Sequence, residues 1–271
     1  MQSTDSWLIL KLMILFAAAM GACFLLNQLQ DVESDRRNNK LFIIAEGCVG
    51  IRAATIEVVF LMVVSLMMAC LVSIQTALFV SAFIFVTGYL YNYEPFGLKD
   101  RPWGSLAANA MMGWLAFAIG WSAYHPFRFS LVVDSLPYLF FNTALYFFTT
   151  LPDMDGDAQS GKRTLAVVHG SKYIIHLSGA LYVLSGVFAF ILHDNQALFF
   201  ILLSMPFFAI TFLQKDTESA VRTTKFAIFF FALAVCLKWP VYFILMIFTF
   251  FLTRWYFKRR FGFDYPNFKT S

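Results

Sequence analysis

The chain has 271 residues, of which 60% are hydrophobic and only 13% are charged, and its mean hydropathy is +0.70. Soluble globular domains are far less apolar than this, so the composition indicates an integral membrane protein. A nucleic-acid partner is not expected, because the net charge of +4 is small and its distribution is explained by membrane topology.

Nine apolar runs follow one another along the chain, and most approach the roughly 20 residues that cross a bilayer as an α-helix. They lie at about residues 7–28, 53–74, 77–91, 105–123, 130–150, 173–192, 196–213, 224–237 and 239–257. Between the last two stands only Lys238-Trp239-Pro240, where we expect a turn or sharp kink, because one helix of the combined length would overshoot the hydrocarbon. The sequence predicts an all-α, polytopic membrane bundle of about eight or nine transmembrane helices, with one domain over residues 1–271.

Positive charges are unevenly distributed if every run crosses the membrane. With the segment after the first run in the cytoplasm, 17 of the 20 Lys and Arg residues fall on that side, and only Lys11, Arg128 and Lys238 fall elsewhere. Such an excess is typical of cytoplasmic loops. We therefore expect the polar loops and the C-terminus to be cytoplasmic, and nine crossings would place the N-terminus outside.

Two acidic clusters begin where apolar runs end. Asn27, Asp31 and Asp35 follow the first run, and Asp153 and Asp157 follow the fifth. Residues four apart share one helix face, so these like charges would repel unless a cation neutralised them. Hard oxygen ligands suit Mg2+, which prefers one or two carboxylates together with substrate phosphates. The clusters therefore predict a metal-bound anion at the membrane surface.

Cations accompany the acids in the predicted cytoplasmic loops. Lys99 and Arg101 stand in the second loop, and Lys162 and Arg163 in the third. Carboxylates and cations around one cavity mouth suit a diphosphate bound through Mg2+, with Lys and Arg neutralising the remaining charge. An apolar tail on the same substrate could lie among the Phe-rich helices. The residues thus predict an enzyme acting on a lipid diphosphate.

The two motifs resemble those of the UbiA superfamily of intramembrane prenyltransferases. Its members carry N-x3-D-x3-D after one helix and D-x3-D four helices later, and this chain has both in that order. The stretch from Asn27 to Asp35, followed by Asn39 and Lys40, looks like that of homogentisate- and quinone-type members. The stretches Pro95–Lys99 and Gly156–Leu165 are also family-like. The resemblance covers about residues 8–260.

Some features depart from the family pattern. The chain begins where the second family helix is expected, so it resembles a member that lacks the first helix, or one whose reading frame continues upstream. The Pro or Arg-Pro that usually follows the first motif is replaced by Leu41–Ile44, and the Lys-Asp pair often found before the second motif is Thr149-Thr150.

The resemblance implies Mg2+-dependent transfer of a prenyl group from a prenyl diphosphate to a small acceptor, aromatic or a quinone precursor, with release of pyrophosphate. Asn27 would serve the metal site as a neutral ligand or hydrogen-bond donor. The carboxylates that would hold Mg2+ are Asp31, Asp35, Asp153 and Asp157.

The resemblance also implies an ionisation mechanism, in which the allylic C–O bond breaks to a carbocation. Lys99 and Arg163 would stabilise the departing pyrophosphate, with Lys162 and Arg101 beside them. Aromatic side chains that could shield the cation are Tyr91, Tyr93 and Tyr146.

Other interpretations remain open from the residues alone. Asp31 and Asp35 could be a solvated helix end, Asp153 and Asp157 a capped turn, and the loop cations simple topology signals. Intramembrane carboxylates also occur in ion transporters, although transporter sites usually lie near the bilayer midplane rather than at helix ends. A third alternative is a catalytically inactive relative that binds prenyl diphosphate without turnover.

The charge asymmetry generates a first prediction. A tag placed after Ser271 should react with a membrane-impermeant reagent only after cells are permeabilised, because the basic tail follows the last run. A cysteine introduced beside Arg128, in a predicted external loop, is the positive control in intact cells. Labelling of the C-terminal tag from outside intact cells would contradict the proposed topology.

Overall fold

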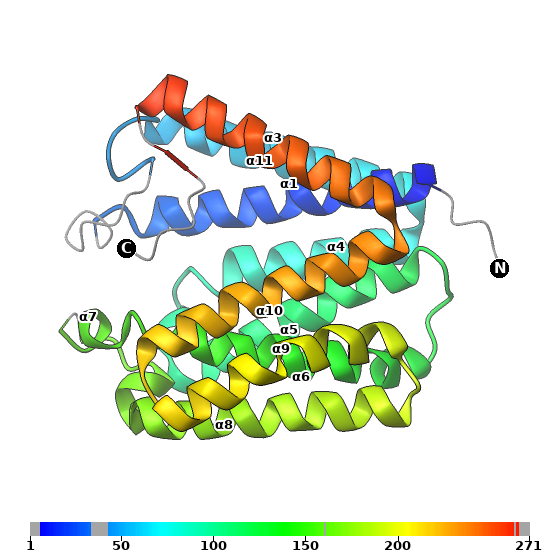
Figure 1. Ribbon diagram of the computed structural model, residues 1–271. Helices are drawn as coiled ribbons and strands as arrows, with labels where there is room; N and C mark the ends of the chain where they lie inside the picture. The colour runs from blue at the N-terminus through cyan, green and yellow to red at the C-terminus, as the bar shows by residue number, and fades with distance from the viewer. Residues whose placement is uncertain (1–5, 34–42, 160, 263, 266–271) are drawn as a thin grey trace.

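The computed structural model describes residues 6–33, 43–159, 161–262 and 264–265, and all regular secondary structure in these ranges is helical. Long helices run back and forth beside one another (Figure 1). In chain order the helices are α1 Ser6–Gln30, α3 Ile51–Val72, α4 Ile74–Ile84, the π-helix η1 Phe85–Leu90, the short 3-10 helix η2 Leu98–Asp100, α5 Pro102–Ser122, α6 Ser130–Thr149, α7 Met154–Gln159, α8 Leu165–Ile191, α9 Asn195–Gln214, α10 Thr217–Lys238 and α11 Pro240–Phe261.

Each of the nine predicted apolar runs is a helix. Within the described residues, seven helices are long and apolar enough to cross a membrane, namely α1, α3, α6, α8, α9, α10 and α11. The α4–η1 segment, Ile74–Leu90, is shorter, and α5 has 21 residues. The expected break falls at Trp239, which separates α10 from α11. The prediction of an all-α polytopic membrane protein is confirmed.

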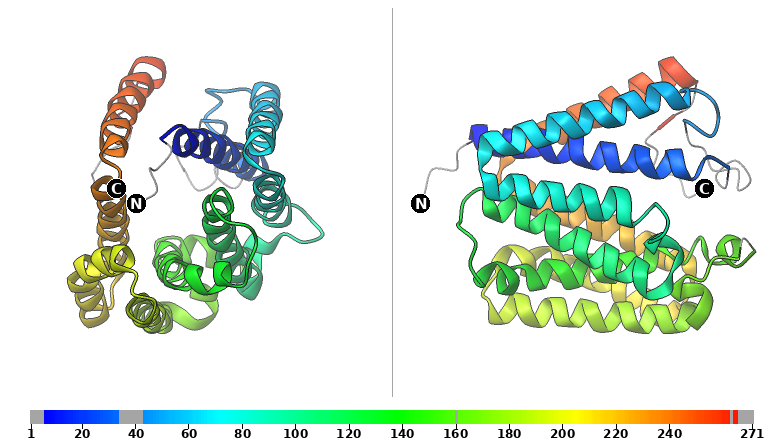
Figure 2. Two further views of the ribbon diagram at one scale, coloured as in Figure 1. Left: turned by 90° about the vertical axis from the view of Figure 1, so that its right-hand side faces the viewer. Right: turned by 180° about the vertical axis from the view of Figure 1, so that it is seen from behind.

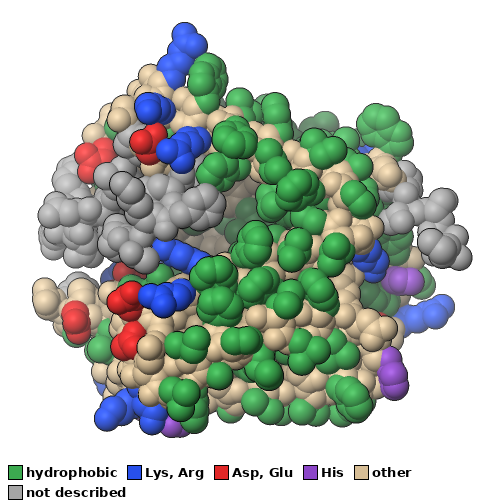
Figure 3. All heavy atoms as spheres, in the orientation of Figure 1, with side chains coloured by type: hydrophobic (Ala, Val, Ile, Leu, Met, Phe, Trp, Pro, Cys, Tyr) green, Lys and Arg blue, Asp and Glu red, His purple; other side chains and the backbone are tan. Residues whose placement is uncertain are grey.

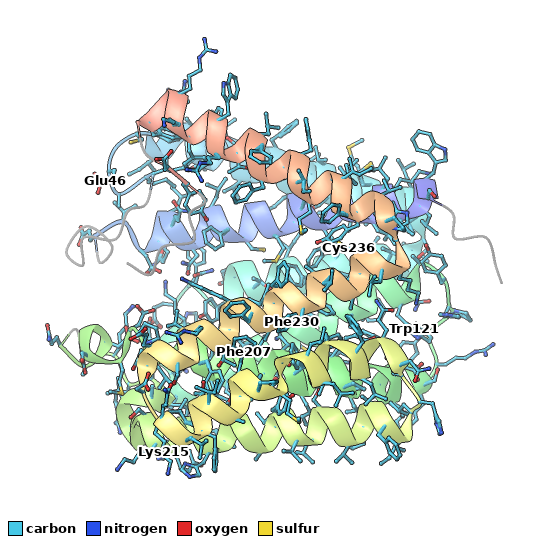
Figure 4. All side chains as sticks on the ribbon, in the orientation of Figure 1. Glu46, Trp121, Phe207, Lys215, Phe230 and Cys236 are labelled. Atoms are coloured by element: carbon cyan, nitrogen blue, oxygen red, sulfur yellow. The ribbon has the colours of Figure 1, made fainter. Side chains whose placement is uncertain are left out.

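Helices pack in neighbouring pairs, chiefly α1 with α3, α6 with α8, and α9 with α10. A cluster of buried aromatic side chains fills the space between α6, α8 and α9, with Phe141, Phe208 and Tyr182 in mutual ring contact. On the α9–α10 pair, Phe207 and Phe230 point toward each other (Figure 4), with ring centroids 5.8 Å apart. Aromatic packing thus holds the half of the bundle that follows α5.

Hydroxyl groups join helices where side chains are small. Ser178 of α8 donates to the carbonyl of Ala144 on α6 at 2.8 Å, and Ser185 donates to that of Pro137 at 2.7 Å. Because lipid offers no hydrogen bonds, such contacts and close packing of small residues are the usual means of joining membrane helices. The acceptor of the second bond is the carbonyl of the proline that lies inside α6.

Helix α8 differs in detail from the element that the sequence predicts. Helix α8 begins at Leu165, eight residues before its predicted start at 173, because Thr164 caps it by accepting a hydrogen bond from the Val167 amide. Gly170, at φ 80°, interrupts the helix between this added turn and the apolar run. At the other end of the chain, α11 buries none of its residues and stands apart from α1 (Figure 2).

Polar and apolar side chains separate along the helix axes. On the face drawn in Figure 3, hydrophobic side chains cover the middle, and most acidic and basic side chains gather at the end that carries α7. This surface is also hollowed between the upper and lower helices. Together with the seven apolar helices, this separation fits an integral membrane protein with one charged end.

Candidate functional site

The first acidic motif lies at the charged end of α1. Asn27 belongs to the last turn of the helix and Asp31 follows it, and the Asp31 amide donates to the Asn27 carbonyl at 3.0 Å. The two side chains are therefore one helical turn apart, as the spacing predicted. Asp35 lies outside the described residues, so its place in the motif stays a prediction.

A short ion pair joins this motif to the second loop. The Lys99 ammonium lies 2.6 Å from an Asp31 carboxylate oxygen, and the two side chains are only 10% and 18% exposed. Lys99 is held on η2, which follows a left-handed turn at Gly97 (φ 46°), and its amide donates to the Tyr91 carbonyl at 3.1 Å. The structure thus places a cation directly against the first carboxylate.

The second acidic motif is also one helical turn. The Asp157 amide donates to the Asp153 carbonyl at 2.8 Å, so Asp153 directly precedes α7 and Asp157 lies in its first turn. The chain then turns back, and the Lys162 amide donates to the Asp157 carbonyl at 2.9 Å. The Lys162 ammonium lies 3.9 Å from a carboxylate oxygen of Asp100, the residue that follows Lys99 in the chain. The second loop is therefore linked to both the first and the third.

Two tyrosines bring the acidic motifs toward a common space. Tyr91 interacts electrostatically with Tyr146 and with the carboxylates of Asp31 and Asp100, and Tyr146 interacts with Asp157. The pKa of the Tyr91 hydroxyl is raised to about 12, chiefly by burial and less by these neighbouring groups, while a hydrogen bond with Asn109 opposes the rise. Tyr91 is thus a neutral phenol between the two motifs at physiological pH.

The position of Tyr91 depends on the π-helix before it. Asn92, which is buried, donates from its amide nitrogen to the carbonyls of Thr87 and Gly88 at 3.0 Å each. A π-turn misaligns backbone groups, and such turns are frequent at functional sites. Hydropathy could not predict this π-helix, because Phe85–Leu90 is as apolar as an ordinary helical segment.

Polar residues on α5 complete the site and were missed in the sequence. The Tyr146 and Ser105 hydroxyls are 2.7 Å apart, and Asn109 donates to the Ser105 carbonyl at 3.0 Å. The sequence contains a pattern that could have indicated them, because Ser105 and Asn109 are polar residues spaced four apart inside an apolar run and so share one helix face. Of the three predicted tyrosines, Tyr91 and Tyr146 meet here, whereas Tyr93 stacks on Tyr89 instead.

The other predicted cations meet in a neighbouring pocket of about 680 Å3. Arg101 is held by its guanidinium, which donates to the Pro95 carbonyl at 2.7 Å. The lining includes Asp100, Arg101, Trp103, Lys162, Arg163 and His169. Lys99 is not part of this lining, so the structure separates it from the other three predicted cations.

The available ligands fit a hard divalent cation. Asp31, Asp153 and Asp157 offer oxygen atoms, and the Lys99 ammonium beside Asp31 shows that this carboxylate accommodates a cation at short range. In the part of the chain that the structure describes, no three His, Cys, Asp or Glu side chains are gathered closely enough to hold a metal by themselves. A metal here would need phosphate oxygens as further ligands, which is the usual arrangement for Mg2+.

Comparison with known proteins identifies the architecture. The model of the UbiA prenyltransferase family matches residues 1–233. A UbiA homolog from Archaeoglobus fulgidus bound to GPP and Mg2+ is 17% identical, with a TM-score of 0.66 over 86% of this chain and 88% of that one. An apo UbiA homolog from Aeropyrum pernix K1 is 14% identical, with a TM-score of 0.70 over 87% of this chain and 91% of that one.

A third similar structure is described as a digeranylgeranylglyceryl phosphate synthase. It is 19% identical, with a TM-score of 0.63 over 86% of this chain and 85% of that one. No curated protein sequence matches this chain. At these identities the solved structures establish the shared fold.

The buried ion pair generates a second prediction. Replacing Lys99 by Met removes positive charge from beside a largely buried carboxylate, and we expect a loss of about 3 kcal/mol in unfolding free energy. Added Mg2+ should restore more stability to this variant than to the wild type, because the metal can take the place of the ammonium. Both effects are measured as thermal unfolding in detergent with EDTA or with Mg2+.

The matched control is Arg222→Gln. It breaks a solvent-exposed pair with Glu218, 2.9 Å long, one turn away on α10, and pairs of this kind contribute about 0.3–0.5 kcal/mol. Equal effects of the two variants, or no difference in their response to Mg2+, would show that Asp31 does not need a cation.

Proposed function

The chain belongs to the UbiA prenyltransferase family, and we propose that it transfers a prenyl group from a prenyl diphosphate to a small acceptor inside the membrane, releasing pyrophosphate. The observation that carries this proposal is the meeting of three loops at one end of the bundle. Lys99 binds Asp31, Lys162 lies near Asp100, and Tyr91 and Tyr146 stand between the two acidic motifs. This arrangement suits a metal-bound diphosphate above an apolar interior.

In this proposal the aspartates bind the diphosphate through Mg2+. Asp31 acts from α1, Asp153 and Asp157 act from α7, and Asn27 and Asp35 complete the first motif. When bound, Mg2+ would neutralise charge on the phosphate oxygens and favour departure of pyrophosphate. Two carboxylate groups facing each other across the substrate explain why neither motif needs to hold the metal alone.

Lys99 has a second role when substrate is present. Its ammonium now neutralises Asp31, and Mg2+ at that carboxylate would release the ammonium for a phosphate oxygen. The negative charge that develops on pyrophosphate as the C–O bond breaks would then be stabilised without reorganising the loop. The pocket that contains Arg101, Lys162 and Arg163 would add positive potential near the mouth and attract the anionic substrate.

The apolar part of the reaction would take place beneath these charges. The C–O bond breaks with its electron pair on pyrophosphate, and the remaining allylic cation is shielded by the rings of Tyr91 and Tyr146. The acceptor then forms the new bond and loses a proton. Exclusion of water by the surrounding helices would prevent capture of the cation as an alcohol.

The proposal also covers the extent of the domain, the orientation of the protein in the membrane and the class of acceptor. We propose that residues 1–271 act as one domain, that the charged end faces the cytoplasm, and that the acceptor is an aromatic compound or quinone precursor, the class used by homogentisate- and quinone-type members. The positive-inside distribution supports the orientation. The Asn27–Asp35 motif supports the subtype.

A pair of substitutions on one short helix tests the proposal. Asp153→Ala should reduce prenyl transfer by at least 10³-fold, since it removes a carboxylate from the metal-bound diphosphate. Asp155→Ala, an exposed neighbour outside the D-x3-D pattern, is the matched control and should retain activity within about twofold. The assay measures Mg2+-dependent pyrophosphate release by purified protein with geranylgeranyl diphosphate and a panel of acceptors.

The possible outcomes separate the competing functions. Release that depends on Mg2+, an acceptor and Asp153 supports prenyl transfer. Metal-dependent binding of the diphosphate with no release would indicate a catalytically inactive relative. Ion flux through reconstituted protein, without any binding of the diphosphate, would indicate a transporter. Equal activity of the two variants would show that the second motif does not hold the diphosphate.

A further inference from the structure

A separate cavity of about 310 Å3 lies within the bundle between α5, α6, α9 and α10. Its walls are mostly aromatic and include Phe117, Tyr138, Phe141, Phe200 and Phe231. Ring contacts between helices hold several of these walls, with Phe200 4.7 Å from Phe141 and 4.9 Å from Phe231 between centroids. The cavity has the size of a site for one small molecule.

The carboxamide of Asn142 lines this cavity from α6. It lies seven residues before the end of the helix at Thr149, which places it about 10 Å from that end. The side chain is exposed, and no hydrogen bond joins it to another group in the part of the chain that the structure describes. A polar group without a hydrogen-bond partner at this depth in the membrane costs free energy. Polar groups in such positions commonly mark a functional site.

Helix α5 is shaped to accommodate this amide. Gly113 faces Asn142, and a β-carbon on that glycine would lie 2.6 Å from the Asn142 amide nitrogen. Any larger residue would force the amide to move. The absence of a side chain at Gly113 therefore allows the Asn142 amide to lie against α5 and leaves the cavity open beside it.

The same helix faces connect this cavity with the proposed diphosphate site. Asn142 is one turn below Tyr146, and Gly113 is one turn below Asn109, so each pair shares a face. Tyr146 and Asn109 belong to the hydrogen-bonded group around Ser105 at the mouth. The cavity thus begins about one turn beneath the position where the allylic cation would form.

We propose that this cavity binds the acceptor of the prenyl transfer, and that Asn142 orients it through a hydrogen bond to an uncharged hydroxyl or carbonyl group on a ring. The inference rests on the proposed function and adds the chemical class of the second substrate. An amide both donates and accepts, so it can bind either group. Aromatic walls favour a planar ring over a flexible chain.

The residues that line the cavity also favour an uncharged acceptor. Among the described residues that line the cavity there is no Lys, Arg or His to bind an acid. The Tyr138 hydroxyl, the other polar side-chain group among the described lining residues, already donates to the Asp194 carboxylate at 2.8 Å. A carboxylate at this depth would be desolvated without a partner, which costs several kcal/mol. A neutral hydroquinone or phenol is therefore favoured over the corresponding aromatic acid.

The first test compares two acceptors that share a 1,4-dihydroxybenzene ring. Methylhydroquinone is neutral, and homogentisate carries a carboxymethyl group on the same ring. Wild-type protein, with Mg2+ and geranylgeranyl diphosphate, should prenylate methylhydroquinone with a kcat/KM at least tenfold higher. A preference for homogentisate, or transfer to neither ring while the diphosphate binds, would overturn the assignment of a neutral acceptor.

The second test uses three variants and measures KM for each substrate separately. Asn142→Leu should raise KM for methylhydroquinone about tenfold, the order expected for one buried hydrogen bond, and leave KM for geranylgeranyl diphosphate within about twofold. Gly113→Ala should raise the acceptor KM as well, because the added β-carbon displaces the amide. Gly120→Ala, on the same helix with no atom within 4 Å of its β-carbon, is the matched control and should change neither value.

Failure of the inference is distinguishable from failure of the proposed function. If Asn142→Leu raises KM for the diphosphate instead, the cavity holds the prenyl chain and the inference is wrong. If neither Asn142→Leu nor Gly113→Ala changes the acceptor KM, Asn142 does not orient the acceptor. If wild-type protein shows no Mg2+-dependent binding of geranylgeranyl diphosphate, the proposed function itself is overturned, and the inference with it.

Discussion

The ion pair between Lys99 and Asp31 is the contact on which the charged end of the bundle depends. It is 2.6 Å long and largely buried, and it ties the end of α1 to the loop that also reaches Lys162 through Asp100. Carboxylates at the edge of hydrocarbon are stable only with nearby cations. In the proposed function, a metal ion would therefore take the place of the Lys99 ammonium at the Asp31 carboxylate, so that the carboxylate always has a neighbouring cation.

The membrane imposes a second constraint, which separates the chemistry by depth. Placing a charged side chain at a helix end costs little free energy, because water and lipid headgroups solvate it there. The same charge a few turns inside the membrane costs much more. The acidic motifs and their cations accordingly lie at the ends of α1, η2 and α7. Farther in, the polar groups that face the bundle interior are neutral, such as Ser105, Asn109 and Asn142.

Much of this could be predicted from the sequence, because hydropathy is a direct consequence of the bilayer. In the part of the chain that the structure describes, each of the nine apolar runs is helical, and Pro240 marked the break before α11. The four-residue spacing predicted that Asp153 and Asp157 share one turn. The early start of α8 and the π-turn at Phe85–Leu90 were not predicted, because a single cap and a local change of hydrogen bonding leave hydropathy unchanged.

The pairing of residues between helices was also beyond the sequence, and this limit applies most to Asn142. Read alone, it is one amide in an apolar run, and its meaning depends on Gly113 of a different helix and on the rings around it. Which faces meet is decided by packing, and packing depends on every contact at once. The charged motifs could be recognised from the sequence, because the proposed diphosphate site needs many charges close together. The proposed acceptor site depends on one amide placed by a second helix, so it can be recognised only in the folded structure.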